Sequence, residues 1–436
     1  MQFFSTNRQS PETNFEDAIF QGLPPDNGLY MPEIIPVLPE TFWKNCDKLT
    51  FNEIAFEVSK AFIGDLIDEN TLKSILEQAY DFDAPLVKLD ENIYCLELFH
   101  GSSMAFKDFG ARFMAGVMSY FLKKSNNRIN ILVATSGDTG GAVAQGFFGK
   151  ENITVTILYP KGKVSELQEK QLTTLGGNVT ALEIDGTFDD CQALVKQAFL
   201  DQELKEKFGL ASANSINIAR LIPQAFYYLY AFSRIKSQNK ELVFSVPSGN
   251  FGNLTAGLIA MKMGMPVKQF IAATNLNKVV PEYLLSGTYK AISPSIATIS
   301  NAMDVGNPSN FPRMLEIFDR DLVKMQKQIC GKYYDDNQTR AGIKELEKDK
   351  KYITCPHSAI AYLGLKDYFI ENKSDAIGIF LSTAHYSKFL PDMEDTLGYL
   401  PEIPERLKSL LDKTKNSEQL TTNYSEFKDF LLKNLK

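Results

Sequence analysis

One lysine of the chain stands in surroundings that favour nucleophilic chemistry. Lys107 lies between Phe106 and Phe109, and an apolar stretch from Ala111 to Leu122 follows it. An apolar environment lowers the pKa of a lysine, and a neutral lysine can attack a carbonyl carbon. The alternative is a lysine at the start of a helix that extends its ammonium group to solvent.

A glycine-containing loop upstream of a helical pattern could bind an anion. Ser136, Gly137, Asp138 and Thr139 follow the apolar run INILVA, and a helical pattern begins near Gly141. Backbone N–H groups at the N-terminus of a helix bind anions well. The alternative is a left-handed turn in which Asp138 and Thr139 only cap the helix.

A second loop repeats this arrangement. Gly249, Asn250, Phe251, Gly252 and Asn253 follow the apolar run ELVFSVP and precede LTAGLIAMKMG. Two glycines three residues apart let the backbone wrap closely around an anion. The loop is neither a Walker A motif nor G-x-G-x-x-G, so it favours the phosphate group of a cofactor over a nucleotide.

The sequence does not predict a metal site. The chain has three histidines, His100, His357 and His385, which are far apart, and five cysteines that occur singly. Neither arrangement matches the spacing of metal ligands. We expect His357 and His385 to pack or to orient other groups rather than to act as acids or bases.

Short apolar runs alternate with amphipathic stretches through most of the chain. Such runs are typical of buried parallel strands, and helical stretches between them indicate an α/β fold. The predicted strands are Ile129 to Ala134, Ile153 to Tyr159, Val179 to Ile184, Leu242 to Val246, Phe270 to Ala273 and Ile377 to Leu381. A chain of 436 residues also exceeds the roughly 250–300 residues of a single core, so we expect two or more lobes. Ligands bind at the carboxyl ends of such strands.

Charge and hydropathy limit the partners of the chain. The formal net charge is −7, which makes binding to nucleic acid or to an anionic membrane unfavourable. The sequence contains no apolar run of about 18 residues, and its first residues lack the pattern of a signal peptide. We therefore expect a cytoplasmic protein that binds a small molecule.

Six segments, in order, resemble segments of one enzyme family. They are HGSSMAFKDFG, ATSGDTGGAVA, ANSINIARLIPQ, VPSGNFGNLTAG, DVGNPSNFPR and LSTAHYSKF, and FEDAIFQGLPPDNGLYMPE near the start adds a seventh. Together they are similar to the threonine synthases, a fold-type II pyridoxal-phosphate family. The resemblance covers residues 15–389.

The resemblance implies an α/β fold of the tryptophan synthase β type. Two open parallel-sheet lobes flanked by helices are expected, together with a mainly helical N-terminal segment. We predict the N-terminal segment at residues 1–85 and a smaller domain at residues 110–210. The larger, cofactor-binding domain would comprise residues 86–109 and 211–436.

The resemblance also implies roles for the residues introduced above. Lys107 matches the lysine that holds pyridoxal 5'-phosphate as a Schiff base and transfers protons. The segment Gly249 to Asn253 matches the cup for the cofactor phosphate, and the hydroxyl of Thr383 matches the partner of the pyridine nitrogen. Many relatives of this fold type carry asparagine at the position of Asp138, so the contact of this residue with the cofactor ring is an open question.

Further residues are expected to bind the substrate. Ser136 to Thr139 resemble the segment that binds the substrate α-carboxylate. Charge-assisted and amide donors suit a phosphate group. The candidates for the substrate phosphate are Asn214, Ser215, Asn217 and Arg220, followed by Lys161 and Lys163. Among them we favour Asn217 and Arg220.

The implied reaction converts O-phospho-L-homoserine and water to L-threonine and phosphate. An alternative is a threonine or serine dehydratase, or a β-replacing synthase, of the same fold. Another alternative is a relative that binds a phosphorylated metabolite without turnover, because a fold alone does not prove activity. We expect a monomer or a homodimer.

Overall fold

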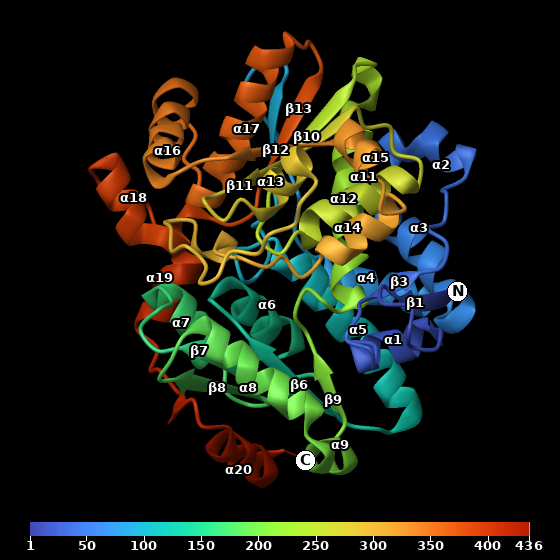
Figure 1. Cartoon of the computed structure of the whole chain (residues 1–436), viewed down its shortest axis with the longest axis vertical. Coiled ribbons are helices and arrows are strands. Elements are labelled where there is room, and N and C mark those ends of the chain that lie inside the picture. Colours follow the sequence, from blue (N-terminus) through green and yellow to red (C-terminus); the bar gives the residue numbers. More distant parts are fainter. Residues whose placement is uncertain (436) are drawn as a thin grey trace.

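The N-terminal part of the chain combines a small antiparallel sheet with four helices (Figure 1). In the computed structural model, which describes residues 1–435, the strand order of this sheet is β2-β1-β3. The strands are β1 (Gln2–Ser5), β2 (Thr13–Asn14) and β3 (Tyr30–Pro32). The helices are α1 (Phe15–Gln21), α2 (Glu40–Asn45), α3 (Phe51–Ile63) and α4 (Glu69–Ala79).

Local capping signals fix where α3 and α4 begin. Thr50 and Glu53 form a capping box at α3, in which each side chain accepts a hydrogen bond from the other residue's backbone N–H. Asp68 accepts a hydrogen bond from the Thr71 N–H (3.0 Å) and caps α4. Both helices lie within the N-terminal segment expected to be mainly helical.

The larger lobe contains a six-stranded sheet in the order β12-β11-β10-β13-β5-β4. All neighbours are parallel except β4 and β5. The strands are β4 (Leu86–Lys88), β5 (Ile93–Glu97), β10 (Leu242–Pro247), β11 (Gln269–Thr274), β12 (Ile329–Tyr333) and β13 (Ile377–Ser382). Figure 1 shows α16 (Asp336–Lys350) and α17 (Pro356–Asn372) on one side of this lobe and α11 (Gln224–Ile235) and α12 (Gly252–Lys262) on the other.

Shorter helices complete the larger lobe around this sheet. They are α10 (Ile218–Leu221), α13 (Val279–Ser286), α14 (Phe311–Ile317), α15 (Leu322–Gln328) and α18 (Leu390–Leu397). α13 and α15 pack on β11 and β12, which lie at one edge of the sheet.

The smaller lobe contains a five-stranded, wholly parallel sheet in the order β14-β8-β7-β6-β9. Its strands are β6 (Ile129–Ala134), β7 (Ile153–Pro160), β8 (Val179–Ile184), β9 (Leu210–Ser212) and β14 (Glu418–Leu420). Its helices are α6 (Asp138–Phe147), α7 (Glu166–Thr173), α8 (Phe188–Leu200), α9 (Gln202–Lys207), α19 (Glu405–Leu411) and α20 (Tyr424–Asn434).

Burial on both faces explains the continuous apolar runs of the central strands. In β6, Ile131 and Val133 belong to the main core, whereas Leu132 and Ala134 belong to a second core under α8 and α20. Alternate residues of a strand point to opposite faces, so both faces of β6 require apolar side chains. The six strands predicted from the sequence are all present.

The C-terminal segment returns to the smaller lobe. β14 pairs with β8, and α20 packs against α8. The sequence-based division instead groups residues 211–436 with the larger lobe, because nothing in the short segment Glu418–Leu420 indicates a strand. The domain boundaries as a whole remain a prediction.

One helix connects all three parts of the chain. α5 (Lys107–Ser125) packs against α4 of the N-terminal part, α6 of the smaller lobe and α10 of the larger lobe. Its first residue is the predicted nucleophile. Among residues 1–435, no helix is both long and apolar enough to span a membrane.

Candidate active site

The carboxyl ends of parallel strands in both lobes face one cavity of about 1050 Å³. β6, β10 and β13 end beside it, as expected for a ligand site in open α/β sheets. The sequence-predicted residues that line it are Lys107, Ser136, Asp138, Thr139, Asn214, Ser215, Arg220, Gly249, Asn250, Phe251, Gly252, Asn253 and Thr383. Gly137 and Asn217 are not part of the lining.

Lys107 is the first residue of α5, and only 17% of its side chain is exposed. Its Nζ lies 3.7 Å from Oδ2 of Asp138. Burial lowers the pKa of Lys107, whereas Asp138 raises it. Lys388 and Arg220 are cations and lower this pKa further. The balance favours the neutral, nucleophilic amine more than in an exposed lysine.

The backbone places Thr383 beside Lys107. Thr383 follows the last residue of β13, and its carbonyl oxygen accepts a hydrogen bond from the Phe106 N–H (2.8 Å). Its own N–H donates to Oγ of Ser358 (3.1 Å). The end of β13 and the start of α5 are thereby held together at the cavity.

Asp138 belongs to a buried charge pair that sequence reasoning did not identify. Its Oδ1 lies 2.7 Å from Nζ of Lys388, whose side chain has no exposed surface. Gln168 donates a hydrogen bond to the same oxygen (3.1 Å). Burial acts to raise the pKa of Asp138, but Lys388 and Lys107 together hold it below its usual range. Asp138 is therefore an ionised carboxylate whose main partner is the buried Lys388, with the Lys107 amine 3.7 Å away.

The loop before α6 presents free backbone donors to the cavity. Gly137 has φ +131°, a conformation that favours glycine. Oγ1 of Thr135 accepts hydrogen bonds from the N–H groups of Gly137 (3.0 Å) and Gly140 (2.8 Å) and fixes the loop. Within residues 1–435, the N–H groups of Ser136, Asp138 and Thr139 have no protein partner. An anion could accept hydrogen bonds from them.

The loop before α12 offers a second set of donors. The N–H groups of Phe251, Gly252 and Asn253 lack protein partners among the described residues. Phe251 occupies the N-cap position of α12, and its side chain has no atom that could accept a capping hydrogen bond. The carboxamides of Asn250 and Asn253 instead hold the loop, by accepting from Ser309 Oγ (3.0 Å) and donating to the Pro247 carbonyl (2.8 Å), respectively. This arrangement fits the phosphate of a cofactor.

The two glycines of this loop have different functions from those expected. Neither Gly249 nor Gly252 has a positive φ, whereas Phe251 does (+59°). A Cβ at position 249 would lie 2.9 Å from Cα of Met303, so Gly249 permits close packing of the backbone. A Cβ at position 252 would have no neighbour closer than 3.5 Å, and its nearest atoms would belong to the side chains of Asn310, Ser215 and Gln224. The left-handed backbone conformation in this loop thus belongs to Phe251 and not to a glycine.

The segment from Asn214 to Arg220 divides between the cavity and the fold. The Asn217 side chain donates to the carbonyls of Ile19 (2.8 Å) and Ser212 (3.0 Å) and accepts from the Ala219 N–H (3.0 Å). Both amide hydrogens of Asn217 and its carbonyl oxygen thus make hydrogen bonds within the fold. Asn214 donates to the Ala134 carbonyl (2.9 Å) and lines the cavity.

Arg220 is buried but incompletely satisfied. Its Nη1 donates to the Ala213 carbonyl, whereas its Nε has no hydrogen-bond partner. Burial lowers the pKa of Arg220 to about 10, which still leaves the guanidinium charged at neutral pH. Arg220 lines the cavity, and its buried positive charge suits an anionic ligand there. Lys163 also lines the cavity, but Lys161 does not.

A second buried arginine positions this segment. Arg313 has no exposed surface and donates hydrogen bonds to the carbonyls of Tyr30 (2.9 Å) and Ile216 (2.7 Å) and to Oδ1 of Asn310 (2.8 Å). Burial lowers its pKa to about 9. Arg313 lies in the quoted motif DVGNPSNFPR, but the motif alone does not indicate that it joins the N-terminal part to the site.

The two histidines show features of orienting residues. Nε2 of His357 accepts a hydrogen bond from the Ala302 N–H (3.2 Å), and burial lowers the pKa of His357 to about 4. Burial also lowers the pKa of His385 to about 4, and its Nδ1 accepts from the Ser387 N–H (3.2 Å). Both rings are neutral at pH 7.

Three family models match the chain. The model described as threonine synthase N terminus matches residues 2–80, and the model for pyridoxal-phosphate dependent enzymes matches residues 80–381. A threonine synthase C-terminal model matches residues 358–431. Threonine synthase of Haemophilus influenzae is 45% identical over 441 residues, which cover 99% of this chain and 100% of the relative.

Solved structures agree with this result. The threonine synthase structure from Escherichia coli has a TM-score of 0.93 and 42% identity, and the match covers 99% of this chain and 100% of that one. The pyridoxal-phosphate-bound threonine synthase from Brucella melitensis has a TM-score of 0.93 and 33% identity, with coverage of 99% and 98%. By sequence, by structure and by three family models, the chain belongs to the threonine synthases, which are pyridoxal-phosphate-dependent enzymes of fold type II.

Proposed function

We propose that Lys107 carries the proton transfers of the threonine synthase reaction, in which O-phospho-L-homoserine and water give L-threonine and phosphate. One observation supports this role above the others. The largely buried amine of Lys107 lies in the same cavity as two sets of backbone N–H groups that lack protein partners. A base must lie beside the carbons that it deprotonates. The two sets of N–H donors suit two anionic groups, the phosphate of the cofactor and the α-carboxylate of the substrate.

The residues around the loop before α12 would hold the cofactor. The N–H groups of Phe251, Gly252 and Asn253 would bind its phosphate, and Thr383 would contact the pyridine nitrogen. A neutral hydroxyl does not require a protonated ring nitrogen. When bound, pyridoxal phosphate supplies an electron sink for the substrate carbon next to the amino group.

The loop before α6 would hold the amino-acid end of the substrate. The N–H groups of Ser136, Asp138 and Thr139 would donate hydrogen bonds to the α-carboxylate. The carboxylate of Asp138, which points to Lys388 and Lys107, has a different task. It holds a compensating negative charge between the two lysines, and so limits their mutual repulsion.

The substrate phosphate would lie near Arg220. The cationic residue Arg220 and the polar residues Asn214 and Ser215 line the same cavity. Lys163 adds a cation to the lining. We propose a positioning role for Asn217, because its carboxamide holds the segment to the carbonyls of Ile19 and Ser212.

Lys107 would then act in sequence on neighbouring carbons. It removes a proton from Cα and a second proton from Cβ, and the C–O bond to phosphate breaks at Cγ. Protons return to Cγ and Cα, while water supplies the hydroxyl at Cβ and a proton to the released phosphate. Because only 17% of the Lys107 side chain is exposed, bulk water has limited access to these protons.

The reaction can be tested by measuring both products. The holoenzyme should release threonine and phosphate in equal amounts from phosphohomoserine. Lys107→Ala should reduce both to a trace, whereas the matched variant Lys205→Ala, at an exposed site on α9, should retain full activity. Retained threonine formation in Lys107→Ala would exclude Lys107 as the base. Formation of 2-oxobutyrate in place of threonine would indicate a dehydratase.

We propose that the chain acts as a monomer or a homodimer. Both lobes of a single chain supply the lining of the cavity, which supports a site that is complete within one copy. Light scattering coupled to gel filtration would determine the mass. A tetramer or a larger assembly would contradict the proposal. The cytoplasmic location also stays a prediction, which cell fractionation would test.

A further inference from the structure

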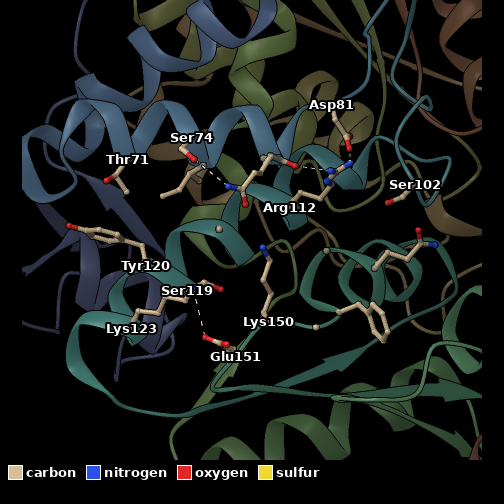
Figure 2. Close-up of a pocket in the computed structure, with 18 of the residues that line it drawn as sticks. Thr71, Ser74, Asp81, Ser102, Arg112, Ser119, Tyr120, Lys123, Lys150 and Glu151 are labelled. Atoms are coloured by element: carbon tan, nitrogen blue, oxygen red, sulfur yellow. Dashed lines mark hydrogen bonds and ion pairs between the residues drawn. The ribbon is translucent and has the colours of Figure 1, made fainter.

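A second cavity, of about 810 Å³, shares no lining residue with the cavity that contains Lys107. Figure 2 shows the residues that line it. Its walls come from α4, from α5 and from the end of α6 with the loop that follows. Three cations line it, namely Arg112, Lys123 and Lys150. A volume of this size is in the range of small-molecule sites.

The carboxylates of the cavity neutralise only part of this charge. Nη1 of Arg112 lies 2.6 Å from Oδ1 of Asp81, and Nζ of Lys123 lies 3.8 Å from Oε2 of Glu151. The ammonium group of Lys150 has neither a hydrogen bond nor an ion pair with any residue from 1 to 435. Figure 2 shows the Lys150 side chain extending into the space between Ser119 and Arg112.

Lys150 is destabilised as a cation in this position. Burial lowers its pKa, and repulsion from Lys123 and Arg112 lowers it further. Oγ of Ser119 on α5 is also buried without a hydrogen-bond partner. Since unmet donors and an uncompensated cation are both unfavourable, an anion that accepts hydrogen bonds would relieve both.

We propose that this cavity binds a phosphomonoester through Lys150, Arg112 and the hydroxyl of Ser119. A phosphate group offers several acceptor oxygens and up to two negative charges, which matches convergent cations and hydroxyl donors better than a single carboxylate does. The cavity is larger than a phosphate ion requires. Phe148 and Tyr120 line the remainder and provide surfaces for an organic body.

The cavity is connected to the active site by rigid elements. Arg112 and Ser119 lie on α5, the helix that begins at Lys107, and Ser102 of the lining lies in the loop just before it. A Cβ at Gly146 near the end of α6 would lie 3.2 Å from the backbone of Ala111 on α5, so these helices touch closely. A bound phosphomonoester would therefore join α4, α5 and the loop after α6.

Local hydrogen exchange in the holoenzyme tests this site separately from the active site. Adenosine 5'-monophosphate and inorganic phosphate are the two probes. Each should slow amide exchange in α4 and in residues 147–151, and the monophosphate should do so at the lower concentration. Equal affinities would assign the site to free phosphate. The absence of protection in these segments with both probes would overturn the proposal.

Charge variants identify the residue responsible. Lys150→Gln should raise the dissociation constant obtained from this protection at least about tenfold, because a hydrogen bond to a charged group is lost. Lys150→Arg should retain most of the affinity, and Lys205→Gln should retain all of it. Unchanged affinity in Lys150→Gln, with an unchanged melting temperature, would exclude the proposed role of Lys150.

Discussion

Replacement of Lys388 by methionine tests the buried charge pair most directly. Lys388→Met preserves the approximate length of the side chain but removes the ammonium group that lies 2.7 Å from Asp138. Neither partner is exposed to solvent by more than 4% of its side chain, so water cannot replace the lost contact. Breaking a buried ion pair from one side costs about 3–5 kcal/mol.

The remaining neighbours of Asp138 reduce this cost. Lys107 lies 3.7 Å away, and Gln168 still donates a hydrogen bond. We therefore expect Lys388→Met to lose about 3 kcal/mol of unfolding free energy, the lower end of that range. The double variant Asp138→Asn/Lys388→Met removes both charges and should lose much less than the sum of the two single variants.

Urea titrations of the four proteins, freed of cofactor, provide the measurement. Cofactor removal is needed because a bound ligand adds its own stabilisation. If the losses of unfolding free energy in the two single variants add up to that of the double variant, Lys388 and Asp138 are not coupled. A loss in Lys388→Met no larger than that in Lys205→Met, at an exposed lysine, would also refute the coupling.

The pH dependence provides a second criterion. The pKa of the Asp138 carboxyl is lower in the folded protein than in the unfolded chain. Its contribution to the free energy of unfolding is therefore complete above the unfolded pKa of about 3.9 and is lost as the pH falls toward the folded pKa. Lys388→Met should raise this pKa. The stability difference between the two proteins should therefore be constant near neutral pH and should decrease below about pH 4.

Three further variants test the active site. Lys107→Ala should abolish threonine formation and the visible absorbance of the bound cofactor, as recorded by spectroscopy; appreciable turnover would contradict its role. Gly252→Val should weaken cofactor binding in a titration, because position 252 lines the cavity and supplies one of the free N–H groups. It should leave the melting temperature of the apoprotein unchanged, because no neighbour lies closer than 3.5 Å to the added Cβ; unchanged affinity would remove the loop from the site. Arg220→Ala should lower kcat/KM for phosphohomoserine by about 10- to 100-fold, as expected for a lost bond of about 1.5–3 kcal/mol to a charged group, and should affect threonine deamination much less. An equal loss on both substrates would assign Arg220 to the fold.

The central strands and the position of the two glycine-containing loops could be predicted because their signals are local. Each buried strand is a continuous apolar run, and each loop follows one such run directly. The predicted helix starts were late: α6 begins at Asp138 rather than near Gly141, and α12 begins at Gly252. Glycine has a low helix propensity, so the glycines in the first turns of both helices obscured where the helices begin.

Contacts between distant segments could not be predicted in the same way. The ion pair of Asp138 with Lys388 joins α6 to the residues before α18, and Arg313 joins α14 to β3. Sequence spacing carries no information about either contact. Asn217 illustrates the converse case, because a polar residue in a recognised motif can serve the fold through three hydrogen bonds. Its place in the site remains a prediction.

The strand order of the smaller lobe also affects how the chain folds during synthesis. β8 ends at Ile184, but its neighbour β14 begins only at Glu418, so one edge of the sheet is uncovered until almost the whole chain has emerged. At about 5–20 residues per second, this interval lasts on the order of tens of seconds. An open apolar edge invites pairing with other chains.

Glu183 gives this edge protection at both stages. In the nascent chain it places a charge on β8, and a charge on an edge strand discourages aggregation. In the finished fold, its carboxylate accepts hydrogen bonds from Lys415 (2.9 Å) and Gln419 (3.0 Å) of the arriving segment. The same carboxylate that charges the open edge of β8 thus binds the C-terminal segment once that segment has been made.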